Sequence, residues 1–525
     1  VRADLRRWSG LGEPGPGTAR SAAALAAILS MTVLTIVGAA PESLGQGFGR
    51  LFLVFAVIVG PATAGLLVLR PWSGLTAWAA MAPLLNVARL QTWIGPVQVT
   101  QSTIFVAALL AGVLLERTAP RVTASNEAPV VPEPWPVRAT LVAAGLIGFP
   151  LLSLLASPAP GAGLPIVLHG VIEPVIVGLL VCALRPTPRQ AIVLGAALVI
   201  GLALASVYSV ARIGRISTSI AELEVMRVQL AHFTFYNVGI YGDALAMVIP
   251  IAAAWLLWRR PLGLGRVGTL VALAALVALL GGLYLTFSKS AWLGTWVALV
   301  AVLIARFQSP RTLALIAVGA AVSLTLIVPF PLYVLDALHL QSTPYQQLLT
   351  KVQGSRLSSW DVGSPEGEVS IGERWRATQA ALRMTVDHPL LGVGPGRFGD
   401  EYAGRYADAG ATRKLGSPHD LMPEVAAELG LPAAVLLTLA FLAALWSAWR
   451  AIRGPDGILR ATGAAFGSAL IAFLVVTAAF GLDLYRDYRV MNSDVIMGAL
   501  IVGVCISLAR WIRPPAPEAA DPTGG

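Results

Sequence analysis

The sequence predicts an all-α polytopic membrane protein with about 12–14 transmembrane helices. Of its 525 residues, 56% are hydrophobic and only 12% are charged, whereas a soluble domain carries about 25% charged residues. About fourteen apolar runs approach the length of roughly 20 residues that a helix needs to cross the hydrocarbon core. These two observations exclude an ordinary soluble enzyme.

The apolar runs follow one another along nearly the whole chain. The run near residue 82 is the weakest because Pro83 and Asn86 lie inside it. The first run follows Arg2, Arg6 and Arg7, but no cleavage site and many further runs come after it, so we expect a retained helix rather than a signal peptide. The runs centre near residues 30, 60, 82, 108, 147, 174, 199, 246, 276, 298, 322, 440, 470 and 502.

The net charge of +9 is spread between the apolar runs and not gathered in one stripe. Basic loops of this kind are typical of the cytoplasmic side of a membrane protein. We therefore expect a multi-pass protein of the bacterial plasma membrane with both termini in the cytoplasm, and no nucleic-acid partner. Cys182 and Cys505 both lie in apolar runs, so neither a disulfide framework nor a thiolate metal site is expected.

Two long segments are expected on the extracytoplasmic side. Residues 211–236 have apolar residues spaced by three or four, which predicts an amphipathic segment at the membrane surface. Residues 335–420 predict a large, partly helical loop, with helical spacing up to Pro389 and a glycine-rich turn after it. The predicted parts are thus N-terminal transmembrane helices (1–210), the amphipathic segment (211–236), central transmembrane helices (237–334), the large loop (335–420) and C-terminal transmembrane helices (421–525).

The large loop is unusually rich in basic residues for its side of the membrane. Arginine offers a planar fork that matches phosphate oxygens, so an anionic ligand would explain the concentration. A solvated surface with ordinary salt bridges explains it equally well. The residues are Lys351, Arg356, Arg374, Arg376, Arg383, Arg397, Arg405, Arg413 and Lys414.

His419 directly precedes the apolar run that starts at Leu421. A neutral imidazole beside a carboxylate such as Asp420 or Glu424 suits a general base, and a capping or merely exposed histidine is the alternative. The histidines and carboxylates show no metal-ligand spacing, so neither a metal nor another cofactor is predicted.

Three further features of the sequence each allow a structural or a functional interpretation. The run from Gly394 to Gly399 matches G-x-G-x-x-G, but no strand precedes it, which favours a tight turn over a dinucleotide site. Within the apolar runs, His169 and Glu173 lie four residues apart, and a buried structural pair is the favoured interpretation. Asp243 is a further ionisable residue at membrane depth.

Three pieces of the sequence together resemble the O-antigen ligase and O-antigen polymerase (Wzy-type) superfamily of bacterial membrane glycosyltransferases. They are "LYLTFSKSAWLGTWVALV", "ALRMTVDHPLLGVGPGRF" and "SPHDLMPEVAAELGLPAAVL". The resemblance covers about residues 227–445 and is most specific over residues 374–432. Asp420 stands where Asn is usual, and Thr378 stands where Trp is common.

The resemblance implies a set of site residues. Arg374 and His419 take the catalytic positions, with Glu428 in register behind the histidine and Asp420 and Glu424 as further supporting carboxylates. In the earlier loop Arg227 matches the family arginine, and Arg212 and Arg215 are weaker candidates. Binding of the substrate diphosphate is thus assigned to Arg227, Arg212, Arg215, Lys289 of the Ser288-Lys289-Ser290 motif, Arg376 and Arg397.

The resemblance also implies a fold of the membrane-embedded glycosyltransferase (GT-C-like) type. The reaction would transfer a glycan from undecaprenyl pyrophosphate to an acceptor hydroxyl on the outer face of the membrane. The expected mechanism is metal-independent and inverting, with a histidine base and arginines on the diphosphate. The donor, a glycan or lipid acceptor and membrane lipids are the expected partners.

Two other functions are alternatives for a membrane protein with this many spans. A lipid-linked oligosaccharide flippase or exporter can have as many spans, but it should show charges lining a midplane cavity and repeated halves. A peptidoglycan polymerase of the shape, elongation and division type also uses a lipid diphosphate donor, but it depends on an external acidic residue rather than on Arg and His. Ligase and polymerase share their chemistry and differ in the acceptor.

Overall fold

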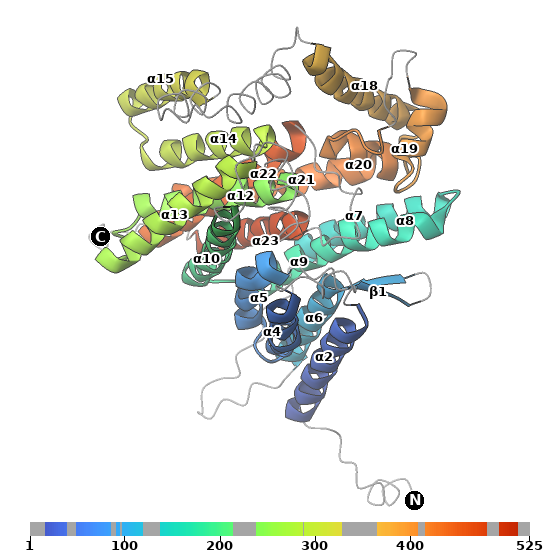
Figure 1. Ribbon diagram of the computed structural model, residues 1–525, viewed down its shortest axis with the longest axis horizontal. Coiled ribbons are helices and arrows are strands. Elements are labelled where there is room, and N and C mark those ends of the chain that lie inside the picture. The colour runs from blue at the N-terminus through green and yellow to red at the C-terminus, as the bar shows by residue number, and fades with distance from the viewer. Residues whose placement is uncertain are drawn as a thin grey trace, which may run out of the picture.

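The computed structural model describes residues 16–38, 49–85, 91–94, 97–118, 137–213, 238–286, 288–327, 365–407, 415–479 and 493–512. Within these ranges the chain is almost entirely helical (Figure 1). The elements are α2 (Pro16–Gly38), α4 (Gly49–Leu69), α5 (Pro71–Leu85), β1 (Gln91–Ile94), β2 (Val97–Thr100), α6 (Gln101–Thr118), α7 (Val137–Ala156), α8 (Pro160–Ile166), the π-helical turn η2 (Val167–Ile172), α9 (Glu173–Leu184), α10 (Pro188–Ile213), α12 (Val238–Leu257), α13 (Arg266–Thr286), α14 (Lys289–Arg306), α15 (Pro310–Ile327), α18 (Pro365–Asp387), α19 (Phe398–Glu401), the π-helical turn η4 (Tyr402–Tyr406), α20 (Leu421–Leu429), α21 (Leu431–Ile452), α22 (Gly457–Ala479), α23 (Ser493–Leu508) and the short 3₁₀ turn η5 (Ala509–Trp511).

Each of the apolar runs found in the sequence coincides with a helix. Among the described residues, seven helices are long and apolar enough to cross a membrane, and five shorter apolar helices accompany them. The all-α polytopic class is therefore confirmed. The antiparallel hairpin β1–β2, in which Gln91 pairs with Thr100, was not predicted; it follows the weak run near residue 82 and leads into α6.

The centre of the bundle is formed by α12 and α22. Both are about four-fifths buried over their apolar windows (78% each), and the six residues from Ala244 to Ile249 are completely buried. Helices α13 and α14 pack around them, whereas α2, α4, α5 and α6 form a second group beside α10 (Figure 1). Close packing of the second group depends on small residues: a Cβ on Gly201 would lie 2.2 Å from Ala80 O.

The outer helices expose apolar side chains that water would disfavour. Leu141 and Leu155 of α7, Val267 and Leu270 of α13 and Leu442 of α21 are each more than half exposed. Such surfaces suit lipid tails, because a bilayer removes the cost of exposing hydrocarbon.

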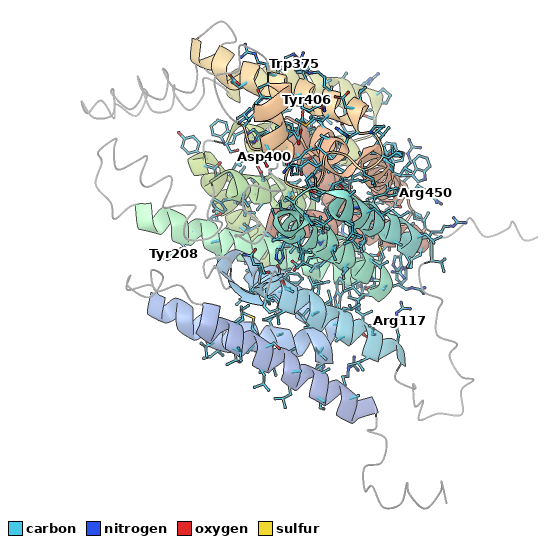
Figure 2. The ribbon with its side chains drawn as sticks, turned by 90° about the vertical axis from the view of Figure 1, so that its right-hand side faces the viewer. Arg117, Tyr208, Trp375, Asp400, Tyr406 and Arg450 are labelled. Atoms are coloured by element: carbon cyan, nitrogen blue, oxygen red, sulfur yellow. The ribbon has the colours of Figure 1, made fainter. Side chains whose placement is uncertain are left out.

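The two ends of the bundle carry different groups. Figure 2 shows Arg117 and Arg450, near the ends of α6 and α21, at one end. Tyr208 and Asp400 lie towards the other end. Helix α18 begins at Pro365, inside the stretch expected to be an irregular polar loop, and ends at Asp387 just before the predicted glycine-rich turn. The amphipathic segment expected at 211–236 lies outside the described residues, apart from the last turn of α10.

Candidate functional site

A small apolar core holds α18 against α20 and the short helices α19 and η4. The spacing of three or four between the buried residues of α18 places them on one face of the helix. The Phe398 and Tyr402 rings stack at 5.6 Å between centroids, beneath this face. The core consists of Ala377, Ala380, Ala381, Met384, Phe398, Tyr402, Tyr406 and Ala427.

Arg374 lies one turn before Thr378 on α18 and is partly buried. Residues four apart share a side of a helix, so Arg374 and Thr378 face the same way. Thr378 Oγ1 donates a hydrogen bond to Asp420 Oδ2 at 3.3 Å. This contact brings the side of α18 that carries Arg374 to the start of α20, next to His419.

His419 has a φ of 59°, in the left-handed region that side chains rarely adopt. Its backbone N–H donates to Ser417 Oγ at 3.0 Å, which fixes the turn before α20. A non-glycine residue in this region costs of order 1–3 kcal/mol, and such residues cluster at functional sites. The sequence predicted the position of His419 at the mouth of α20, but not this strained backbone.

Asp420 has extended backbone and occupies the N-cap position of α20, but its side chain makes no capping hydrogen bond. Burial raises the pKa of the Asp420 carboxyl, and the hydrogen bond from Thr378 opposes that rise. Thr378 and Asp420 are the two positions noted above as departures from the family pattern, and they contact each other.

Helix α20 has two chemically different faces. Asp420, Glu424 and Glu428 recur every four residues on one face, and Glu424 and Glu428 are completely or almost completely buried (0% and 1% exposed). The other face carries Leu421, Val425 and Leu429, which line an apolar cavity of about 440 Å³. Residues of α7, α9, α21 and α23 complete this cavity.

Glu428 ties the glycine-rich turn to α20. Its Oε2 accepts the N–H of Gly396 at 2.7 Å and its Oε1 accepts the N–H of Phe398 at 2.8 Å. The backbone oxygen of Glu428 accepts from Gly394 N (3.1 Å) and Ser153 Oγ (2.9 Å), so the end of α7 joins the same cluster. Burial raises the pKa of Glu428 to about 8, against the opposing effect of the two N–H groups.

The glycines of the turn are required by close approach. Gly392 has a φ of +67°, and a Cβ there would lie 2.3 Å from the carbonyl carbon of Glu428. Gly430 has a φ of +90°, and its Cβ would lie 2.2 Å from Leu390 O. The chain on both sides of α20 is thus packed backbone to backbone.

Two of the predicted diphosphate ligands have acidic neighbours. Arg376 Nη1 lies 3.3 Å from Oε1 of the buried Glu373. Arg397 forms ion pairs with Glu401 (3.1 Å) and Asp400 (3.6 Å), in the turn that leads into η4. Both guanidinium groups are therefore partly neutralised, in line with the salt-bridge alternative given for the basic residues of this loop.

Only some of the other predicted diphosphate ligands lie within the described residues. Arg215 and Arg227 lie outside the described residues, and Arg212 is placed by its backbone alone, in the last turn of α10. Lys289 is the first residue of α14, capped by Ser288, whose Oγ accepts from Ala291 N at 3.5 Å. Gly242 of α12 adjoins this cap, since its Cβ would lie 3.0 Å from Ser288 Cβ.

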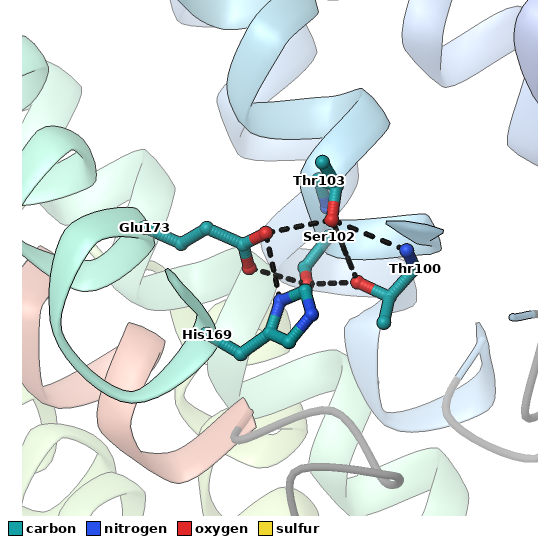
Figure 3. A network of polar contacts seen from close by, with 5 residues as sticks. All are labelled: Thr100, Ser102, Thr103, His169 and Glu173. Atoms are coloured by element: carbon teal, nitrogen blue, oxygen red, sulfur yellow. Dashed lines mark hydrogen bonds and ion pairs between the residues drawn. The ribbon is translucent and has the colours of Figure 1, made fainter. Parts of the chain in front are cut away.

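A second polar cluster lies in the membrane region, where the sequence indicated a His169–Glu173 pair (Figure 3). His169 Nδ1 donates to Glu173 Oε1 at 2.9 Å, and both residues are buried. Ser102 and Thr103 of α6 each donate a hydroxyl hydrogen bond to the same carboxylate at 2.7 Å. The buried His169–Glu173 contact is confirmed, and its structural role stays a prediction. Ser102 and Thr103 were missed because small hydroxyl residues in an apolar run give no distinctive signal.

Within the described residues, no group of three or more His, Cys, Asp or Glu side chains is arranged to hold a metal ion. The groups available for chemistry at the start of α20 are the imidazole of His419, the neighbouring carboxylates and the side of α18 that carries Arg374. An apolar cavity lies against the adjacent face of the same short helix.

The family model described as O-Antigen ligase matches residues 274–438, from within α13 to the middle of α21. The match includes α18, the glycine-rich turn and the whole of α20. A search of curated proteins gives no significant match.

Proposed function

Because residues 274–438 match the O-antigen ligase family model, we propose that the chain is a membrane glycosyltransferase of that family that uses a lipid-linked glycan as donor. The donor is a glycan on undecaprenyl diphosphate, and the acceptor is a hydroxyl group of a lipid or of another glycan. The reaction takes place on the extracytoplasmic side of the plasma membrane.

The observation that best supports this proposal is the Thr378–Asp420 contact at the start of α20. It brings the Arg374 side of α18 next to His419, while the adjacent face of α20 borders the apolar cavity. A lipid diphosphate needs both environments: cationic groups for its phosphates and hydrocarbon for its tail. The cavity beside Leu421, Val425 and Leu429 is the proposed site of the first part of that tail.

In the proposed reaction His419 acts as general base. Its imidazole takes the proton of the acceptor hydroxyl as the hydroxyl oxygen attacks the anomeric carbon. The bond from that carbon to the phosphate oxygen breaks, and the diphosphate leaves with the electron pair, so the configuration inverts in one step. Arg374 stabilises the negative charge that develops on the leaving diphosphate.

The other predicted residues take supporting roles in the proposal. Asp420 and Glu424 orient and polarise the imidazole from the acidic face of α20, and Glu428 holds the glycine-rich turn in place. Arg376, Arg397, Lys289, Arg212, Arg215 and Arg227 add positive charge for the diphosphate. No metal ion is required, because arginines supply the positive charge that a divalent cation would otherwise supply.

The proposal is tested by measuring release of undecaprenyl diphosphate from a lipid-linked glycan by the purified protein in liposomes. We expect Arg374→Ala to lower transfer by about 100-fold or more, as removal of a charge-stabilising donor does elsewhere. Arg374→Lys should recover only part of the loss, because an ammonium group cannot replace the planar fork. Addition of a metal chelator should leave the wild-type rate unchanged.

Arg383→Ala is the matched control on the same helix. Arg383 is exposed and donates to Tyr406 O at 3.4 Å, away from Asp420, so transfer should stay near the wild-type rate. Normal transfer by Arg374→Ala would remove Arg374 from the mechanism. Absence of release by the wild type, together with movement of the lipid-linked glycan across the bilayer, would favour a flippase instead.

A further inference from the structure

A cavity of about 1040 Å³ lies where three turns of the bundle meet. The turns connect α12 with α13, α14 with α15, and α21 with α22. Five arginines of these turns and of the adjoining helix ends line the cavity: Arg259, Arg260, Arg306, Arg453 and Arg460. Gly457 fits closely against Pro261, since its Cβ would lie 2.8 Å from Pro261 Cβ, so two of the turns are in contact.

The cavity lies at the end of the bundle opposite the candidate site. Helix α21 starts at Leu431, directly after Gly430 at the end of α20, and ends at Ile452, which lines the cavity. Its 22 residues span roughly 33 Å at about 1.5 Å per residue, close to the roughly 30 Å of a hydrocarbon core. Figure 2 likewise shows Arg450 and Asp400 towards opposite ends.

The charge of this cavity is not balanced by the protein. Within the described part of the chain, none of the five arginines forms an ion pair, and no Asp or Glu lines the cavity. Asp456, in the α21–α22 turn, accepts the N–H of Ile458 at 2.9 Å. Arg376 and Arg397, near the candidate site, are paired with carboxylates. The five arginines are exposed and line one cavity, so their like charges disfavour one another and the arrangement favours a bound anion.

Two of the guanidinium groups are held in place before any ligand binds. The guanidinium carbon of Arg306 lies 5.7 Å from the Trp258 ring centre and 5.4 Å from that of Phe307, and Arg306 Nε donates to Leu257 O at 3.3 Å. The guanidinium carbon of Arg453 lies 4.3 Å from the Trp449 ring centre. Such stacking restricts the side chains while leaving N–H groups available for phosphate oxygens.

The surroundings favour a lipid over a soluble anion. Leu256, Leu257 and Ile452 line the same cavity as the arginines. Phe307 and Trp449 are each more than one third exposed, as aromatic residues at a membrane interface are. A soluble phosphate would gain nothing from this apolar and aromatic border, whereas a phospholipid would place its glycerol and first methylenes there.

We propose that this cavity binds an anionic phospholipid whose headgroup carries two phosphates, of the diphosphatidylglycerol class. Two phosphates offer enough oxygens to engage several guanidinium forks at once, and the acyl chains extend along the apolar helices beside the cavity. The proposal is independent of the proposed function, because the cavity and the candidate site lie at opposite membrane surfaces.

The test measures lipid binding to the purified full-length protein by native mass spectrometry, with diphosphatidylglycerol and phosphatidylethanolamine as probes. The test variant is the double substitution Arg260→Gln with Arg460→Gln. The matched control is Arg189→Gln with Arg311→Gln, two exposed arginines that do not line the cavity. Melting temperatures in lipid-free detergent verify that both double variants are folded.

We expect diphosphatidylglycerol to bind the wild type at least about tenfold more tightly than phosphatidylethanolamine, and the test variant to lose about tenfold or more of that affinity. The control should stay within about twofold of the wild type. Equal loss in both double variants would show nonspecific charge attraction and overturn the proposal. Displacement of the lipid by an equal concentration of inorganic pyrophosphate would also overturn it, since the cavity would then hold a soluble phosphate.

Discussion

Three residues in α20 or directly before it combine backbone strain, burial and charge. His419 adopts a left-handed backbone and Asp420 is held by a hydroxyl from another helix. Glu428 is buried and accepts two backbone N–H groups. These features cost folding free energy, which is typical of residues retained for a function.

The raised pKa of Glu428 predicts a pH dependence of stability. The folded state binds the Glu428 proton more tightly than the unfolded state, whose value is near 4.5, so this stabilisation is complete below about pH 4.5 and is lost as the pH rises through about 8. The melting temperature in detergent should therefore fall between pH 5 and pH 8.5. Glu428→Gln, which cannot ionise, should remove this part of the fall. An equal slope in wild type and variant would contradict the assignment.

The Thr378–Asp420 bond predicts a shift in the pH profile of transfer. The bond lowers the pKa of Asp420 against the effect of burial, so its loss in Thr378→Val should raise that pKa. If ionised Asp420 assists His419, the acidic limb of the rate profile should move to higher pH in Thr378→Val. Thr385→Val is the control, because Thr385 bonds only to Ala381 O of its own helix. An unchanged acidic limb in Thr378→Val would separate Asp420 from catalysis.

Among the elements, the turn between α18 and α19 and the short helix α20 depend on each other. Their backbones meet at Val393 N and Ala427 O (2.8 Å) and at Leu431 N and Pro389 O (2.8 Å). Gly392 and Gly430 allow this approach because neither position has room for a Cβ.

This packing predicts that Gly392→Ala destabilises the protein by about 2 kcal/mol or more, from the strained φ and the clash together. Gly404→Ala is the matched control, since nothing lies within 4 Å of its Cβ position. Thermal unfolding in detergent measures both. Equal melting temperatures for the two variants would mean that the turn is not packed as described.

The hydrogen-bonded cluster around Glu173 joins α6 to α9. Glu173→Ala should leave the buried donors of Ser102, Thr103 and His169 without an acceptor, and we expect a loss of about 3 kcal/mol. Glu116→Ala removes an exposed carboxylate from α6 and should leave the stability unchanged. The two melting temperatures provide the comparison, and a Glu173→Ala value equal to that of Glu116→Ala would refute the role of the cluster.

The sequence predicted the helices better than the contacts between them. A sufficiently long apolar run in the sequence locates a membrane helix, and each of the predicted runs is helical. The β1–β2 hairpin lies between two apolar runs and has too few residues for a clear alternating pattern. The pairing of Arg376 with Glu373 and of Arg397 with Glu401 depends on local side-chain geometry, which a count of basic residues does not contain.

In the candidate site, too, the sequence predicts individual residues better than the contacts between them. The resemblance proposes His419, Arg374 and Glu428 as site residues, but it does not predict the two bonds from Glu428 to the glycine-rich turn, which join residues about 30 positions apart. Pairings over such separations are set by the packing of helices. The left-handed backbone of His419 likewise follows from the turn that precedes α20, and histidine itself gives no signal for it.

For the whole molecule, the charge of the loops predicts the orientation in the membrane. Gly265→Cys lies in the α12–α13 turn and Gly404→Cys in η4, and both positions border open space. A membrane-impermeant thiol reagent applied to intact cells should label Gly404→Cys and spare Gly265→Cys, because the positive-inside rule predicts that the basic turns face the cytoplasm. The buried Cys182 and Cys505 should not react. The opposite labelling pattern would reverse the orientation and place the site in the cytoplasm.

The most direct measurement compares His419→Ala with His388→Ala in the liposome transfer assay, following release of undecaprenyl diphosphate. His388 is exposed at the end of α18, so its loss should leave transfer near the wild-type rate. Loss of the general base should lower transfer by about 100-fold or more in His419→Ala while its melting temperature is retained. Wild-type transfer by a folded His419→Ala protein would contradict the proposed mechanism.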